Sequence, residues 1–159
     1  MKILILGSSG ILGRKLYSNL KKHFKTVHTG LLRRKFNIEK IIKIKNILEK
    51  EKPNLVINCL AIADIETCEK QKKYTYKINV QILKEILKLK KNLNFQFIQF
   101  STDQMYDNKK KIYSNEKFNP IIYNEYTRQK IMAEKICLKY KCLIFRTNDI
   151  SWHGLPTPI

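Results

Sequence analysis

The first thirteen residues constrain the fold of this chain more than any other segment. Residues 2–6 read Lys-Ile-Leu-Ile-Leu, a nearly continuous apolar run of strand length that ends at Gly7. Gly10 and Gly13 follow at a spacing of three, and an amphipathic helix pattern begins at once. A strand, a glycine turn and a helix in this order can hold a dinucleotide pyrophosphate, because free N–H groups at the helix start bind the anion. We expect nucleotide binding here, and a plain glycine-rich turn is the alternative.

Each glycine has its own role in this prediction. Gly7 allows a tight turn, Gly10 lets the backbone approach the phosphates, and Gly13 lets the helix pack closely on the strand. The predicted cofactor-binding residues of this bend are Gly7, Gly10, Ile11, Leu12 and Gly13.

Strand and helix patterns alternate along the rest of the chain. Strands are expected at Lys2–Leu6, Lys25–Thr29, Leu55–Leu60, Phe95–Phe100 and Cys142–Arg146, with a weaker one near Phe36–Ile38. Helices are expected at Ile11–Lys22, Ile38–Lys50, Tyr74–Leu89 and Asn124–Tyr140, and a long polar loop at Ser101–Pro120. This alternation predicts an α/β fold, a doubly wound parallel (Rossmann) sheet of about six strands with helices on both faces. Residues 1–150 would form this domain, and ligands would bind beyond the carboxyl ends of the strands.

Composition narrows the classes of protein to which the chain can belong. The 159 residues suit one domain, and 43% hydrophobic residues exclude a disordered chain. No apolar run is long enough to span a membrane and the start does not resemble a signal peptide, so a cytoplasmic location is expected. The four cysteines form no CxxC pair and suggest no metal site, and Cys59 and Cys142 are expected in the core.

The net charge of +19 raises the question of nucleic-acid binding. The lysines are scattered over every expected helix, and Ile and Asn are also abundant, which indicates a compositional bias. Nucleic-acid binding is therefore not expected, although the charge should attract anionic ligands at low salt.

A tyrosine and a lysine four residues apart, Tyr126 and Lys130, lie on the last expected helix. This spacing puts them on one helix face, where an ammonium lowers the pKa of a nearby phenol and makes it a usable proton donor or acceptor. The hydroxyl of Thr102, at the end of the fourth clear strand, could bind the same substrate oxygen. The alternative for the pair is an ordinary solvated helix face.

Several segments match one known family in the right order. They are the glycine turn, LVINCLAIADIETCEK at 55–70, FIQFSTDQMYD at 97–107, Tyr126 with Lys130, and LIFRT at 143–147. From Met1 to about Trp152 the chain resembles the extended short-chain dehydrogenase/reductase family, and within it the dTDP-4-dehydrorhamnose reductases. The resemblance implies an oxidoreductase of nucleotide-sugar and polysaccharide biosynthesis, which reduces the C4 keto group of a dTDP-sugar with hydride from NADPH.

The resemblance also implies roles for individual residues. Thr102, Tyr126 and Lys130 would be the catalytic set. Lys130 would also hold the nicotinamide ribose, and Tyr126 would contact the cofactor too. Leu60, Ala61 and Ile62 would line the cofactor, and Asn37 and Ile38 would contact the adenine.

Cofactor choice depends on the segment after the second strand. An acidic residue there would hold the 2′-hydroxyl of NAD, but the chain reads Thr29-Gly30-Leu-Leu-Arg33-Arg34. Arg33 beside Arg34 favours the 2′-phosphate of NADP, and NAD stays possible if both are ordinary surface charges.

Some residues depart from the family pattern. Thr127 and Gln129 replace small residues between the catalytic tyrosine and lysine, Tyr123 competes with Tyr126 for the catalytic position, and Leu60 is bulky where the nicotinamide would rest. The acidic cluster Asp64, Glu66 and Glu69 follows a strand and precedes a helix, where acids favour the helix start; a metal or acid–base site is the alternative.

Residues 151–159 form a short tail where the family's substrate domain would begin. The expectation is a cofactor-binding half whose missing lobe is covered by a homo-oligomer or a partner chain. A non-catalytic NAD(P)-binding regulatory or partner protein, or an inactive remnant, is the alternative.

Overall fold

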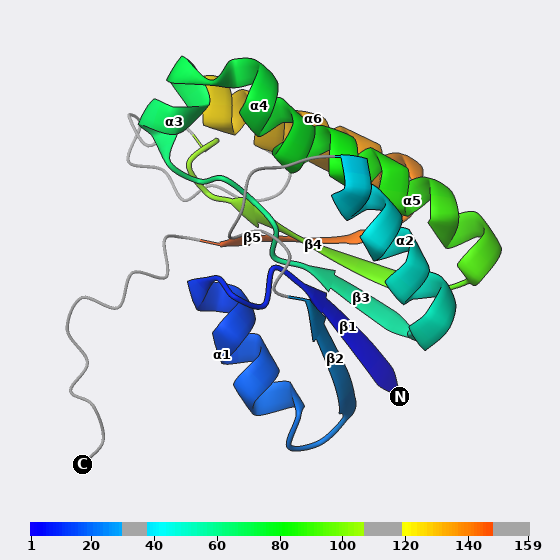
Figure 1. The fold of residues 1–159 in the computed structure, drawn as a ribbon. Helices are drawn as coiled ribbons and strands as arrows, with labels where there is room; N and C mark the ends of the chain where they lie inside the picture. Colours follow the sequence, from blue (N-terminus) through cyan, green and yellow to red (C-terminus); the bar gives the residue numbers. More distant parts are fainter. Residues whose placement is uncertain (30–37, 107–118, 148–159) are drawn as a thin grey trace, which may run out of the picture.

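A sheet of five parallel strands, in the order β2-β1-β3-β4-β5, forms the centre of the part of the chain that the structure describes (Figure 1). This computed structural model describes residues 1–29, 38–106 and 119–147. The strands are β1 Lys2–Leu6, β2 Lys25–Thr29, β3 Leu55–Asn58, β4 Gln96–Thr102 and β5 Leu143–Thr147. The order reverses next to β1, which creates a crevice outside the carboxyl ends of β1 and β3.

The helices connect successive strands. They are α1 Ile11–Leu20, α2 Ile38–Glu51, α3 Ile65–Lys70, α4 Lys72–Tyr76, α5 Ile82–Leu93 and α6 Glu125–Lys139, with a π-helical turn, η1 Lys77–Gln81, leading into α5. The doubly wound α/β fold predicted from the sequence is confirmed. Within the described ranges, no helix is both long and apolar enough to cross a bilayer.

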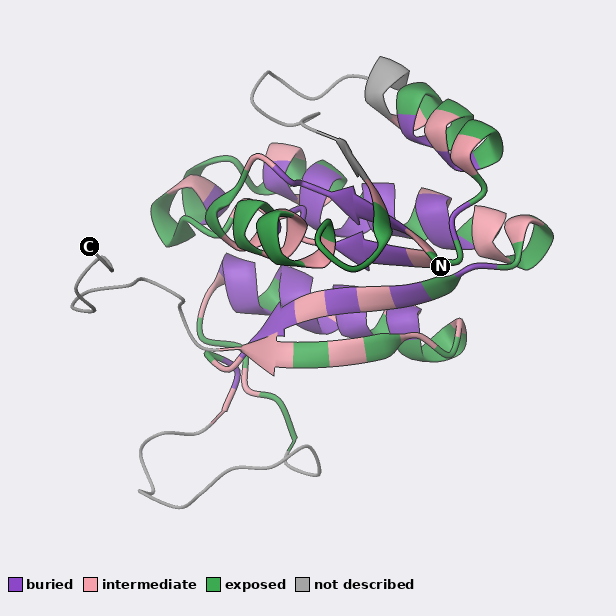
Figure 2. Cartoon of the chain, turned by 90° about the horizontal axis from the view of Figure 1, so that it is seen from below, coloured by how far each residue is buried: buried purple, intermediate pink, exposed green. Residues whose placement is uncertain are grey.

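The two faces of the sheet are covered unequally (Figure 1). Helices α2, α5 and α6 pack on one face, where Leu6, Leu48 and Leu87 belong to a large buried cluster. On the other face α1 packs over a smaller cluster that contains Ile3 and Ile57. No described helix lies over the β4–β5 part of this second face (Figure 2). Most of the core therefore lies on the side of α2, α5 and α6.

The uncovered part of the sheet exposes large apolar side chains on the edge strand. Leu143 is 63% exposed and Phe145 is 48% exposed. The Phe145 ring lies 6.0 Å from the ring of Phe100 on β4, which is itself only partly buried. These residues, together with Ile98, are called the open face below.

Several expected boundaries were wrong. Ile38 begins α2, so the weak strand near Phe36–Ile38 does not include it; Phe36 and Asn37 lie outside the described residues. The helical region after β3 begins at Ile65, nine residues before the expected Tyr74. It starts early because Asp64 caps α3, its side chain accepting a hydrogen bond from the Thr67 amide at 2.7 Å.

Candidate functional site

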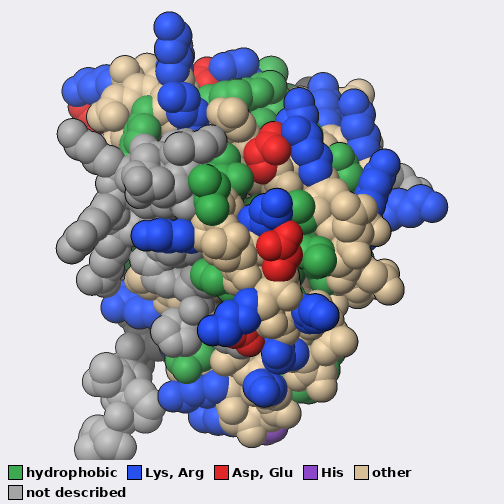
Figure 3. All heavy atoms as spheres, turned by 45° about the vertical axis from the view of Figure 1, so that its right-hand side comes forward, with side chains coloured by type: hydrophobic (Ala, Val, Ile, Leu, Met, Phe, Trp, Pro, Cys, Tyr) green, Lys and Arg blue, Asp and Glu red, His purple; other side chains and the backbone are tan. Residues whose placement is uncertain are grey.

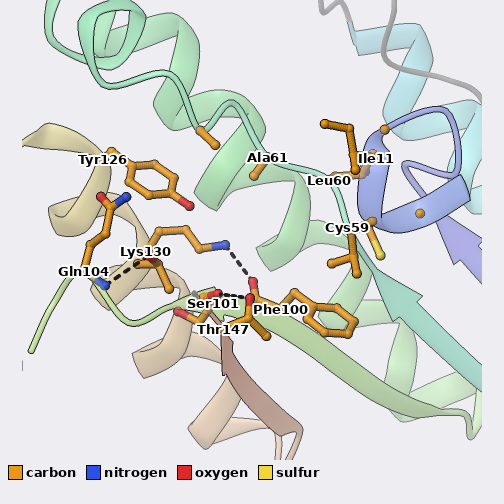
Figure 4. Close-up of a pocket in the computed structure, with 15 residues that line it drawn as sticks. Ile11, Cys59, Leu60, Ala61, Phe100, Ser101, Gln104, Tyr126, Lys130 and Thr147 are labelled. Carbon is orange, nitrogen blue, oxygen red and sulfur yellow. Dashed lines mark hydrogen bonds between the residues drawn. The ribbon is translucent and has the colours of Figure 1, made fainter. Parts of the chain in front are cut away.

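A pocket of about 330 Å³ opens at the carboxyl edge of the sheet, beside the strand-order reversal (Figure 4). Four parts of the chain meet there: the start of α1, the segment after β3, the end of β4 and the first turns of α6. Thr147 of β5 completes the lining. The lining residues are Gly10, Ile11, Leu12, Gly13, Cys59, Leu60, Ala61, Ala63, Phe100, Ser101, Thr102, Gln104, Tyr126, Lys130 and Thr147.

The glycine bend between β1 and α1 is held by a hydrogen bond within its own backbone. Gly7 has φ of +76°, a conformation that L side chains rarely adopt, and its carbonyl accepts from the Gly10 amide at 3.0 Å. A Cβ on Gly13 would lie 2.3 Å from that same carbonyl oxygen. Only glycine at both positions therefore allows α1 to start this close to β1.

The start of α1 suits an anion. The first backbone bond into the helix joins the Arg14 amide to the Gly10 carbonyl, so the amides of Ile11, Leu12 and Gly13 precede the intrahelical series. Gly10 supplies no side-chain cap, and the first turn carries no acidic residue. These amides and the positive end of the helix dipole are the features that bind phosphate.

The segment after β3 forms a second wall of the pocket, and two asparagines hold its backbone. The Leu60 amide donates to Asn58 Oδ1 at 3.1 Å. The Ile62 amide donates to Asn79 Oδ1 at 2.8 Å, while Asn79 Nδ2 donates to the Ile62 carbonyl at 3.0 Å. Leu60 is buried, and its side chain reaches the space that a Cβ on Gly7 would take. The wall is thus fixed by specific hydrogen bonds.

Helix α6 carries the tyrosine and the lysine into the pocket. Figure 4 shows the Tyr126 hydroxyl and the Lys130 ammonium extending from this helix into the same space. The Lys130 nitrogen lies 6.0 Å from the centre of the Tyr126 ring and donates to the Phe100 carbonyl at 2.6 Å. Tyr126 is 7% exposed, whereas Tyr123 is 46% exposed and does not line the pocket. Of the two competing tyrosines, the structure thus brings Tyr126 beside the lysine.

Burial changes the acid–base behaviour of two groups at this site. Burial lowers the pKa of Lys130 to about 8, although Glu134 opposes the shift. Burial also raises the pKa of Cys59 to about 12, against the effect of the Lys130 charge. Near neutral pH the lysine therefore keeps most of its charge and the thiol keeps its proton.

The end of β4 supplies two hydroxyl groups. Thr102 Oγ1 accepts from the Gln104 amide at 3.2 Å, which leaves its own O–H to be donated elsewhere. Ser101 Oγ is buried and is the one such side-chain atom among the described residues without a hydrogen-bond partner. A bound ligand could therefore accept a hydrogen bond from the Thr102 hydroxyl.

Capping explains why α6 begins where it does. Asn124 and Thr127 form a capping box, in which the Thr127 amide donates to Asn124 Oδ1 at 2.8 Å. Glu69 accepts from the Glu125 amide at 2.6 Å, and this hydrogen bond lowers the pKa of the Glu69 carboxyl. Thr127, which departs from the family pattern, thus stabilises the start of α6. The acidic cluster also acts at helix starts, as its position predicted, since Asp64 caps α3.

An ion pair between a half-buried arginine and a buried glutamate holds the β5 side of the site. Arg146 makes two hydrogen bonds to Glu134, at 2.9 and 2.7 Å, and a third to the Tyr106 hydroxyl at 3.0 Å. The carboxylate of Glu134 is the main cause of the raised pKa of Arg146. These contacts tie β5 to α6 and to the chain that follows β4.

The structure brings most of the predicted site residues together. Gly10, Ile11, Leu12, Gly13, Leu60, Ala61, Thr102, Tyr126 and Lys130 all line the pocket. Gly7 and Ile62 do not, because Gly7 packs against Leu60 and the backbone of Ile62 is bonded to Asn79. Arg33, Arg34 and Asn37 lie outside the described residues, as does the predicted tail at 151–159. Ile38 is described only as the first residue of α2.

Six lining residues were not assigned a role from the sequence. These are Cys59, Ala63, Phe100, Ser101, Gln104 and Thr147. All but Phe100 lie at the carboxyl ends of β3, β4 and β5, where the sequence predicted that ligands bind, and Phe100 lies two residues before the end of β4. Cys59 was expected in the core but is only half-buried, as is Cys142, whereas Cys68 and Cys137 are fully buried.

Comparison with known proteins gives a consistent family match. Residues 1–152 match the family described as RmlD substrate binding domain. A dTDP-4-dehydrorhamnose reductase of Aggregatibacter actinomycetemcomitans is 25% identical over 151 residues, covering 92% of this chain and 51% of the relative. The methionine adenosyltransferase 2 subunit beta of Mus musculus is 25% identical over 148 residues, covering 87% of this chain and 43% of the relative.

A solved structure shares the fold. The crystal structure of dTDP-4-dehydrorhamnose reductase from Bacillus anthracis str. Ames, in complex with NADP, matches with a TM-score of 0.82 at 21% identity. The match covers 92% of this chain and 53% of that one. The chain thus spans about half the length of the proteins it matches.

Proposed function

The chain belongs to the RmlD substrate binding domain family, and from that membership we propose that it is an NADP(H)-binding, reductase-like domain that acts on a nucleotide sugar. The observation that carries the proposal is the pocket, where the start of α1 lies beside Thr102, Tyr126 and Lys130. One pocket thus combines a site for a pyrophosphate with a set of proton-donating groups.

The residues of the bend fit a dinucleotide. The amides at the start of α1 have no capping side chain and no nearby acid, so a diphosphate can bind them. Ala61 and Ala63 leave room along the wall that runs from this bend toward Tyr126. The NADP in the Bacillus anthracis structure supports NADP over NAD as the cofactor. When bound, the cofactor would supply a hydride.

The groups of this chain would then manage the substrate oxygen. Thr102 would donate its free O–H to that oxygen, and Tyr126 would donate the proton that completes the alcohol. Lys130, as an ammonium near the Tyr126 ring, would favour the loss of that proton and hold the ribose of the cofactor. A keto group on a dTDP-sugar is the substrate that the family match favours.

Calorimetric titration with NADPH and with NADH tests the cofactor half of the proposal. We expect NADPH to bind more tightly than NADH, because only NADPH carries the 2′-phosphate. Gly13→Ala should abolish binding, since its Cβ would collide with the Gly7 carbonyl. Binding of neither nucleotide to the wild-type chain would reject the proposal.

A matched pair of tyrosine variants tests the chemical half. Tyr126→Phe should keep NADPH affinity and lose reduction of a dTDP-4-keto-6-deoxy sugar, followed as loss of NADPH absorbance. Tyr123→Phe should keep both, because Tyr123 does not line the pocket. Equal turnover by the two variants would exclude Tyr126 as the proton donor.

A second candidate is a non-catalytic subunit that binds the same cofactor. It is favoured by the match to a protein named as the beta subunit of an adenosyltransferase. In that case NADPH binds, but no ketosugar is reduced and Tyr126→Phe changes nothing. Binding without turnover in the wild-type chain would therefore favour the second candidate.

A further inference from the structure

Gln129 lies directly before Lys130 on α6, but it is not one of the residues that line the pocket. It is fully buried, with no exposed surface. A buried amide is retained at low cost only when its donors and acceptor are all bonded, so the partners of Gln129 indicate what it does.

Every hydrogen-bonding group of the Gln129 side chain has a partner. Its amide oxygen accepts from Asn79 Nδ2 at 2.8 Å. Its amide nitrogen donates to Thr75 Oγ1 at 2.9 Å and to Glu125 Oε1 at 2.8 Å. One side chain thus joins α6 to α4, where Thr75 lies, and to η1, where Asn79 lies.

The bond to Asn79 leads directly to the opposite wall of the pocket. Asn79 binds the backbone of Ile62 through both its amide oxygen and its amide nitrogen. Ile62 lies between Ala61 and Ala63, and both of these line the pocket. Two buried amides therefore connect the helix that carries Tyr126 to the wall that faces it.

We propose that Gln129 is a positioning residue, which acts through Asn79 to fix the spacing between α6 and the pocket wall at Ile62. Hydrogen bonds between buried amides hold a narrow range of distance and direction, and no water competes for them here. This proposal rests on the proposed function, because the spacing matters only if a cofactor lies between Tyr126 and that wall.

Gln129→Met tests the proposal, since methionine has a similar length and no amide. The control is Cys137→Ala, on the same helix and equally buried, but away from the pocket. Loss of the buried bonds should speed hydrogen exchange at the Ile62 amide about tenfold and weaken NADPH binding about tenfold. Cys137→Ala should lower the melting temperature while changing neither measurement.

Unchanged Ile62 exchange in Gln129→Met, or equal losses in the control at a similar melting temperature, would overturn the positioning role. If wild-type protein does not bind NADPH, the proposed function fails, but the exchange measurement still decides whether the bridge exists. Should Gln129→Met not fold, Gln129→Asn keeps an amide that is too short to reach Asn79, and it should speed Ile62 exchange in the same way.

Discussion

The ammonium of Lys130 donates to the carbonyl oxygen of Phe100 at 2.6 Å, across the gap between α6 and β4. The same carbonyl accepts from Gln99 Nε2 at 2.7 Å, and Gln99 accepts from Asn58, whose side chain also holds the Leu60 amide. The lysine is thus joined by buried hydrogen bonds to the wall of the pocket. Its position depends on the sheet beneath it as well as on its own helix.

The buried charge of Lys130 should make stability depend on pH. Its pKa is about 8 in the folded protein against 10.5 as the ordinary value. Below pH 8 both states hold the proton; between about 8 and 10.5 the unfolded state holds more protons, so the free energy of unfolding rises with pH. Lys130→Met should lack this rise, which amounts to at most about 3 kcal/mol. Urea unfolding at a series of pH values measures it.

The effect of Lys130 must be read from the difference between the variant and the wild type, because the titration of Cys59 changes the free energy of unfolding in the opposite direction. Its pKa is raised to about 12, so the folded state holds the thiol proton longer and stability falls above pH 9. Lys88→Met, at an exposed position on α5, is the control and should follow the wild-type curve. Parallel curves for Lys130→Met and wild type would show that Lys130 titrates alike in both states.

Alanine should be tolerated at one glycine of the bend between β1 and α1 and should destabilise the fold at another. Gly13→Ala places a Cβ 2.3 Å from the Gly7 carbonyl oxygen, whereas the Cβ of Gly10→Ala would lie 3.4 Å from it. We expect Gly13→Ala to destabilise the fold by about 3 kcal/mol through overpacking, and Gly10→Ala by less than about 1 kcal/mol. Thermal unfolding of both proteins tests this order, and equal losses would contradict it.

The sequence predicted best those elements whose signal is local. The apolar run before Gly7 and the glycines at spacing three predict β1, the bend and α1, because the requirement for glycine is partly local: Gly7 takes a positive φ, and the Gly7 carbonyl excludes a side chain at Gly13. Tyr126 and Lys130 reach one pocket because a helix sets their spacing. Thr102 joins them because parallel strands end at one edge of the sheet.

The parts that escaped prediction depend on partners distant in the chain. Asn79 is separated in sequence from its partner Ile62 by 17 residues and from its partner Gln129 by 50. No local sequence pattern predicts such hydrogen bonds for an asparagine or a glutamine. The early start of the helical region at Ile65 was missed because α3 and α4 are short and polar, so their apolar period is weak. The start of α3 is fixed by the local Asp64 cap, whereas the bonds of Asn79 and Gln129 depend on tertiary contacts.

Breaking the ion pair between Arg146 and Glu134 should lower the free energy of unfolding more than breaking a surface ion pair does. Glu134→Ala would leave the half-buried guanidinium of Arg146 without the carboxylate that accepts two of its hydrogen bonds, which should cost about 1.5–3 kcal/mol. Glu66→Ala removes an exposed pair with Lys70 and should cost less than about 1 kcal/mol. Chemical denaturation of the two variants makes the comparison. Similar losses would mean that the Arg146–Glu134 pair contributes no more to stability than an exposed ion pair does.

The open face should make the protein associate with itself when its charge is screened. Leu143 and Phe145 expose apolar surface on an edge strand, which favours contact between copies, while the net charge of +19 keeps them apart. Figure 3 shows Lys and Arg side chains spread over one face of the molecule, with few Asp and Glu side chains among them. Raising the salt concentration shortens the range of this repulsion, so light scattering should report a larger mass at about 0.5 M salt than at low salt.

Leu143→Lys and Phe145→Lys should suppress the increase. Leu138→Lys, at a leucine that is 65% exposed on α6 outside the open face, should not. If the three variants associate alike, the edge strand is not the contact between copies.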